Sequence, residues 1–179
     1  MIRSLRNALA PINRIPPEIL TLIPTFWTDD VDEEWSMVTL THVCRGWREI
    51  FISCSSLWTC LDCENADKTR VYLERSKSSP ITLWLDRGER LLADDPFFEI
   101  DPRAISHLKY LDIQGSTENL QDITRQLSHP APLLEKLTIE IDNIGHGPRR
   151  GPVALTALFN GDLSSLRELT LHCIHTSLP

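Results

Sequence analysis

The sequence predicts an α+β protein in which a small all-α module is followed by an α/β solenoid fragment of repeating strands and helices. Two observations support this prediction. Over residues 12–63 apolar side chains recur at helical spacing, whereas four segments after residue 80 share one alternating apolar signature. The chain has 179 residues, of which 41% are apolar and 24% charged, so it can bury a core and differs from a disordered polymer.

The first helical segment is expected to begin near Asn13, whose side chain can cap a helix. Pro16 suits the opening turn. Apolar residues then repeat at helical spacing at Ile19, Leu20 and Ile23. A module of roughly 50 residues buries its core incompletely, so we expect this apolar face to finish its burial against another polypeptide. The alternative is that the face packs on the repeats.

A second helix is expected after the acidic segment 29–34, which should be solvated. Its apolar residues recur every three or four positions and form one stripe: Val43, Trp47, Ile50 and Phe51. The segment that follows a turn rich in serine and cysteine should fold back onto this stripe. We therefore assign the core of the module to five side chains: Val43, Trp47, Ile50, Leu57 and Trp58.

Four segments after residue 80 carry a strand signature in which leucine or isoleucine alternates with other residues. The equivalent leucines are 28, 26 and 32 residues apart, at Leu83, Leu111, Leu137 and Leu169. Helices are expected between the strands, one carrying Leu120, Ile123 and Leu127, and one carrying Val153, Leu155, Leu158 and Phe159. A strand with a return helix cannot bury its apolar face alone, so the units must stack as a leucine-rich-repeat-like solenoid.

The outward residues of the strands should form three ladders that line the concave face, the usual binding surface of such solenoids. Trp84 and Tyr110 are candidate anchors, because aromatic side chains dominate interaction hot spots. The alternative is a solvated face without a ligand. The candidate substrate face is Trp84, Tyr110, Asp112, Lys136, Thr138, Glu140, Glu168, Thr170 and His172, with Thr82, Asp86 and Gln114 completing the ladders.

The composition argues against several classes of partner. The net charge is −7 and the pI is about 5.3, so the chain has no overall field to attract nucleic acid or anionic lipid. No run approaches the roughly 18 apolar residues that span a bilayer. The tail of residues 1–11 lacks the long apolar block of a secretory signal, so we expect a cytoplasmic or nuclear protein with reduced cysteines.

Sequence signals for chemistry are weak. Cys60 and Cys63 have metal-ligand spacing, but a structural zinc needs four ligands, and Leu61 between them fits a short edge strand. His42 and Cys44 suggest nucleophilic catalysis, yet no third orienting group accompanies them. The loop over residues 145–152 lacks the lysine and hydroxyl residue that end a phosphate cradle. We therefore expect neither metal nor cofactor and no enzymatic activity.

The first part of the chain resembles the F-box, a small helical module. The resemblance starts at Ile15-Pro16-Pro17-Glu18-Ile19-Leu20, resumes at Val43-Cys44-Arg45-Gly46-Trp47-Arg48-Glu49-Ile50, and closes at Ser56-Leu57-Trp58. Residues 72–80 are similar to the linker that introduces the repeat domain in many fungal F-box proteins. The stretch 21–42 departs from the family pattern because it is long and acidic.

The resemblance implies a substrate receptor of an SCF-type ubiquitin ligase, in which the F-box docks on the Skp adaptor and through it on a cullin scaffold. It implies a tail over 1–11, an F-box over 12–63, a helical linker over 64–80 and repeats over 81–179, of about four strands and incomplete. The adaptor-binding residues would be Ile15, Pro16, Ile19, Leu20 and Ile23. The repeats would capture an unknown protein target. The alternatives are an F-box scaffold without a ubiquitination role and, for contrast, a cysteine hydrolase.

The last strand motif is followed by no polar capping unit. An open solenoid end exposes an apolar face and a strand edge. We expect that the repeat region is incomplete, or that a partner or self-association closes it.

Overall fold

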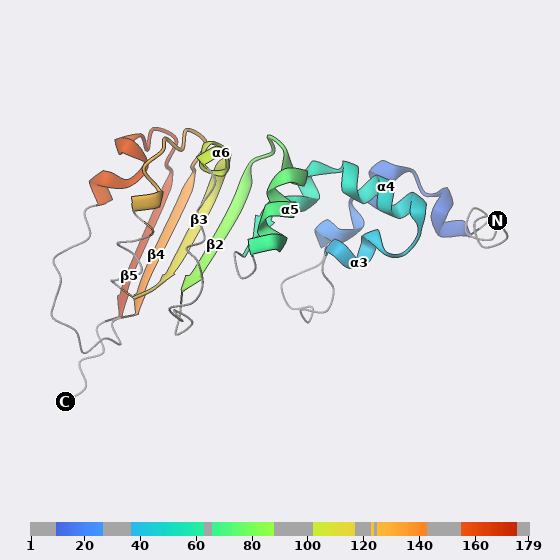
Figure 1. Ribbon diagram of the computed structural model, residues 1–179, viewed down its shortest axis with the longest axis horizontal. Helices are drawn as coiled ribbons and strands as arrows, with labels where there is room; N and C mark the ends of the chain where they lie inside the picture. The colour runs from blue at the N-terminus through green and yellow to red at the C-terminus, as the bar shows by residue number, and fades with distance from the viewer. Residues whose placement is uncertain are drawn as a thin grey trace, which may run out of the picture.

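The computed structural model describes residues 10–26, 37–62, 66–87, 102–116, 123, 125–142 and 155–174. These residues form a mixed α/β fold with short helices and a five-stranded, all-parallel sheet in the order β1-β2-β3-β4-β5. The order in space is thus the order in the chain. The first helical segments and the sheet lie at opposite ends of the molecule, with α5 between them (Figure 1).

The helical module consists of six short segments, because prolines and turns interrupt every run. They are η1 (Pro11–Arg14), α2 (Pro17–Leu20), η2 (Ile23–Phe26), α3 (Met37–Thr41), α4 (Arg45–Ser53) and η3 (Ser55–Trp58). The expected capping role of Asn13 is wrong, since Asn13 lies inside η1 and Pro16 precedes α2. The acidic segment 29–34 lies outside the described residues.

The single apolar stripe predicted for the second helix is interrupted before α4. The amides of His42 and Val43 donate to the carbonyls of Thr39 and Leu40 and form a turn after α3. Cys44 is extended, and α4 begins only after it. The side chain of Val43 is consequently 55% exposed, so its assignment to the module core is wrong. Because this turn interrupts the helix, Val43 and Trp47 do not lie on one face of the same helix.

The repeat region supplies the strands and two further short helical elements. The strands are β1 (Cys60–Leu61), β2 (Ile81–Arg87), β3 (Leu108–Gly115), β4 (Lys136–Asp142) and β5 (Glu168–Ile174). The helical linker is α5 (Ala66–Ser76), and α6 (Pro102–Ser106) precedes β3. The four predicted strands are confirmed, and the short edge strand expected at Leu61 adds the fifth.

The strand register confirms the equivalences predicted from the repeat signature. Leu83 pairs with Leu111, Leu111 with Leu137, and Leu137 with Leu169. All three outward ladders form as predicted, with one irregularity between Ile81 and Thr82. A one-residue slip would turn every leucine outward, so the alternation itself specifies this register.

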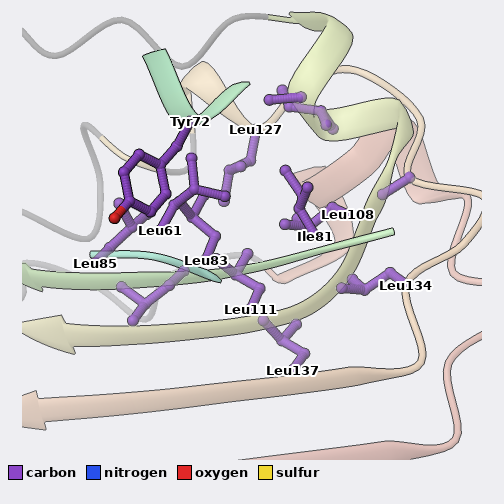
Figure 2. Close-up of a cluster of buried hydrophobic side chains, with 14 of the residues drawn as sticks. Leu61, Tyr72, Ile81, Leu83, Leu85, Leu108, Leu111, Leu127, Leu134 and Leu137 are labelled. Carbon is purple, nitrogen blue, oxygen red and sulfur yellow. The ribbon is translucent and has the colours of Figure 1, made fainter. Parts of the chain in front are cut away.

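The core lies on the inner face of the sheet, where the leucines and isoleucines of β2, β3 and β4 are almost fully buried, except for Ile141, which is partly buried. Figure 2 shows these side chains gathered with Tyr72 of α5 and with Leu127. Ile123 and Leu127 are buried as predicted, whereas Leu120 and Val153 lie outside the described residues. Apolar side chains on the covered face of a parallel sheet are typically buried to this extent.

The helix expected before the last strand is not a regular helix. Residues Leu155–Gly161 form the 3₁₀ element η4, which is kinked at Leu158, and Phe159 has φ of 53° in the left-handed region. This conformation is strained for a bulky side chain. Leu158 and Phe159 are nevertheless fully buried, and the Phe159 amide donates to the Leu127 carbonyl at 2.6 Å. Burial of these two side chains therefore offsets the strain.

The indole of Trp58 joins the helical module to α5 and the sheet. It is fully buried, and its Nε1 donates to the Phe51 carbonyl at 2.8 Å. Its ring meets the Tyr72 ring edge-on at 4.9 Å, and the Arg75 guanidinium lies 4.3 Å from the ring centroid. The Thr82 amide of β2 donates to the Thr59 carbonyl at 2.8 Å. The Trp58 indole thus joins the module to the linker, and the backbone hydrogen bond of the next residue joins the module to β2.

Trp58→Ala should lower the free energy of unfolding by about 3–5 kcal/mol, because it removes a fully buried aromatic side chain and leaves a cavity. The measurement is urea unfolding followed by circular dichroism. In the control Trp84→Ala, the lost indole is 43% exposed, so the loss should be no more than about half as large. Equal losses in the two variants would contradict the joining role of Trp58.

Tyr72 should make the fold sensitive to alkaline pH. Burial raises the pKa of the Tyr72 phenol above its ordinary value of 10.0, so the folded state holds this proton more tightly than the unfolded state. The resulting stabilisation is complete below pH 10.0 and is lost as the pH rises through the raised pKa. Urea unfolding at pH 8 and pH 11 should show a smaller alkaline loss for Tyr72→Phe than for the natural chain. An identical loss would contradict this role.

Candidate protein-interaction site

An exposed apolar surface lies on the first helical segments. We call it the N-terminal patch and define it by four residues that are 37–52% exposed: Ile12, Ile19, Leu22 and Ile23. Val38 and Val43 add exposed apolar area elsewhere in the same module. Exposed apolar side chains on successive segments of a small module are typical of a protein-binding surface.

The brevity of the helices explains why the patch is exposed. Helix α2 has four residues, and only Leu20 of them is buried. Four residues make barely one turn, so one apolar side chain reaches the core while Ile19 faces solvent. The Thr21 and Thr25 hydroxyls donate to backbone carbonyls three residues earlier, which satisfies part of the backbone of these short turns.

A side-chain hydrogen bond and ring packing hold the first helical segment against α4. The Trp47 indole nitrogen donates to the Asn13 side-chain oxygen at 2.8 Å, which ties η1 to α4. The Trp47 ring packs at 5.5 Å from the Phe51 ring, and Phe51 is almost fully buried. An open groove between α2 and α4, lined by Pro17, Thr21 and Ile50 among others, lies beside these contacts. The segment that carries the patch is therefore anchored to the longest helix of the module.

The five predicted adaptor-binding residues differ in their exposure to solvent. Pro16, Ile19 and Ile23 are exposed, and Ile15 is partly buried against the core. Leu20 is only 2% exposed, so its placement on the binding surface is wrong: it faces the core on the other side of the turn. Ile12 and Leu22 were missed. The spacing of Leu22 three residues after Ile19 could have indicated it, whereas the exposure of Ile12 has no clear sequence signal.

The predicted module core is confirmed for most of its members. Leu57 and Trp58 are buried, whereas Trp47 and Ile50 are partly buried and pack against the core. Val43 is the exception described above.

A second surface is the outer face of the sheet, which carries the nine residues of the candidate substrate face. Trp84 and Tyr110 are 43% and 37% exposed, an unusual exposure for aromatic side chains on a polar face. Glu168 and His172 are exposed, and the other five residues are partly exposed: Asp112, Lys136, Thr138, Glu140 and Thr170. The register places all nine on one face, and their binding of a target stays a prediction.

Two lysines on or beside this outer face each lie close to a carboxylate. Lys136 donates to Glu168 at 2.7 Å across the strands. This hydrogen bond raises the pKa of Lys136, and the charges of Glu168 and Asp112 favour its ammonium form as well. The Lys109 ammonium lies 5.2 Å from the Tyr110 ring centroid and 3.7 Å from the Glu135 carboxylate.

The apolar residues of β5 differ from their equivalents in β4. Leu169 and Leu171 are 49% and 50% exposed, whereas Leu137 and Ile139 are buried. Strand β5 is the last strand of the sheet in the described chain. This is the exposed apolar face that the sequence analysis expected on the last strand, and closure by a partner or by self-association stays a prediction.

The residues weighed for metal binding do not form a metal site within the described ranges. There, no three His, Cys, Asp or Glu side chains are placed to hold a metal ion. Cys44, Cys54 and Cys60 form no disulfide within the described residues, and Cys63 and the loop 145–152 lie outside the description. Among the helices that are described, none is long and apolar enough to cross a membrane.

Comparison with known proteins gives no relative: no family model, no curated protein and no solved structure matches this chain.

The contrast between two adjacent residues tests the assignment of the patch. Leu20→Ala should lower the free energy of unfolding by about 2–5 kcal/mol, because a buried leucine is truncated. Ile19→Ala removes a side chain that is 52% exposed and should cost less than about 1 kcal/mol. Urea unfolding of both variants measures the difference. A larger loss for Ile19→Ala would contradict the orientation of α2.

Proposed function

We propose that this protein is a non-catalytic substrate receptor of an SCF-type ubiquitin ligase, which docks on the Skp adaptor through the N-terminal patch. In this proposal the adaptor joins the chain to a cullin scaffold, and the outer face of the sheet presents a target protein. The observation that supports it most is the exposure of Ile19, which lies in the block that resembles the F-box opening. Ile12, Leu22 and Ile23 are exposed on either side of that block.

The position of the patch favours a partner from outside the chain. The alternative that the first helical face packs on the repeats is wrong, because Ile19 is 52% exposed and the sheet lies at the other end of the molecule (Figure 1). The free energy of burying these side chains remains available to a partner, at about 25 cal/mol for each Å² of apolar surface removed from water.

The separation of the two surfaces suits a receptor. A receptor that performs no chemistry acts by holding its target near a ubiquitin-charged enzyme, which raises the effective concentration of the target. The Trp58 contacts join the two ends, so a target bound to the sheet would be held at a defined distance from the adaptor. The proposed location is the cytoplasm or the nucleus, with neither nucleic acid nor membrane as a partner.

Ile19→Asp combined with Leu22→Asp should abolish co-purification with the Skp adaptor, weakening binding on the order of 100-fold, because two charges are placed in an apolar interface. Both residues are about half exposed, so the variant should keep its circular dichroism spectrum and its urea midpoint. The matched control is Leu169→Asp with Leu171→Asp, which places two charges on exposed leucines of β5 and should leave adaptor binding unchanged.

Adaptor binding by the folded Ile19/Leu22 variant would contradict the proposed docking site. Failure of the natural chain to bind the adaptor would contradict the proposed function as a whole. Adaptor binding without cullin recruitment or ubiquitin-chain assembly on any target would instead support the scaffold role.

A further inference from the structure

The outer face of the sheet contains one carboxylate that the described residues leave unsatisfied. The Oδ1 atom of Asp112 is buried and has no hydrogen-bond partner in the described structure. Oδ1 itself has no contact with solvent, whereas the residue as a whole is partly exposed. A buried carboxylate oxygen without a partner is costly and rare in proteins, so the fold alone does not account for this carboxylate.

Two exposed aromatic side chains flank this carboxylate. Trp84 of β2 is the direct cross-strand neighbour of Asp112, and Tyr110 lies two residues before it on the same face of β3. Neighbours across a sheet and two residues along a strand are about 5–7 Å apart, within reach of one side chain of a ligand. The carboxylate therefore lies beside two exposed ring surfaces.

The lysine on the neighbouring strand β4 already forms an ion pair with another carboxylate. Lys136 lies one strand away and its ammonium contacts Glu168 at 2.7 Å, while Lys109 contacts Glu135. Among the side chains described on this face, the carboxylates of Asp112, Glu140 and Glu168 outnumber the ammonium of Lys136, so the face is negative. The charge pattern thus favours a cation from outside.

We infer that Asp112, Trp84 and Tyr110 form a recognition site for an arginine side chain of the target protein. Its guanidinium would pair with the Asp112 carboxylate and stack on the exposed indole of Trp84. This inference rests on the proposed receptor function, because it names the chemistry of the target that the receptor presents.

Arginine fits this site better than lysine or a neutral side chain. Its planar guanidinium offers five N–H donors in a fork that matches a carboxylate, and it stacks on aromatic faces. Tryptophan is the aromatic residue that attracts cations most strongly. A neutral ligand would leave the Asp112 charge unbalanced, and the phosphates of a nucleic acid would be repelled by it.

The test is a titration of the isotope-labelled full chain with the blocked peptide Gly-Ser-Arg-Ser-Gly, followed by NMR shifts of the Trp84 indole. The matched ligand replaces arginine by citrulline, which has nearly the same shape and no charge. We expect the arginine peptide to bind at least tenfold more tightly than the citrulline peptide and severalfold more tightly than the lysine peptide.

Asp112→Asn should remove the preference for arginine over citrulline, whereas Glu74→Gln, which neutralises an exposed carboxylate on α5, should change it less than twofold. Asp112→Asn removes an unsatisfied charge, so its melting temperature should equal or exceed that of the natural chain. Trp84→Leu is a second variant that keeps Asp112, and it should weaken binding of the arginine peptide at least fivefold.

Equal binding of the arginine and citrulline peptides, or an undiminished preference in Asp112→Asn, would overturn the inference. Equal binding of the lysine peptide would overturn the assignment to arginine. Adaptor binding is measured separately on the same protein. A chain that binds the adaptor but not the arginine peptide refutes this inference alone, and loss of adaptor binding refutes the proposed function.

Discussion

The burial of the Trp58 indole is the constraint on which the arrangement of the molecule depends. One side chain donates a hydrogen bond to the carbonyl of Phe51 in α4, meets the ring of Tyr72 in α5, and lies under the guanidinium of Arg75. These contacts belong to the helical module and to the linker, and the linker packs on the sheet (Figure 2). The N-terminal patch and the outer face of the sheet are therefore parts of one continuous body.

The sheet imposes a second constraint that explains its outer face. Each strand of this parallel sheet buries its leucines only if neighbouring strands keep the same phase, so the residues between them align in ladders. The phase that buries Leu111 and Ile113 also directs Asp112 outward beside Trp84. A buried carboxylate oxygen without a hydrogen-bond partner at that position is unfavourable for folding, which is the kind of local inconsistency that binding sites show.

Much of the sheet, but less of the helical module, could be predicted from the sequence. Apolar and other residues alternate in the same way in four strands. The ladders through Lys136 and Thr138 can therefore be predicted by aligning the strand sequences. The module lacks such a long pattern. The turn before α4 places the Val43 side chain in solvent. In α2, which has only about one helical turn, Leu20 is buried whereas Ile19 is exposed. The missing partner of Asp112 depends on tertiary contacts that no local pattern encodes.

Amide hydrogen exchange of the full chain, alone and with the Skp adaptor, tests most directly whether the exposed first segment is completed by a partner. We predict that the adaptor slows exchange in residues 10–26 at least tenfold and leaves the strands β3 and β4 unchanged. Protection confined to the sheet, or no protection in a verified complex, would contradict the account in which this end of the molecule docks.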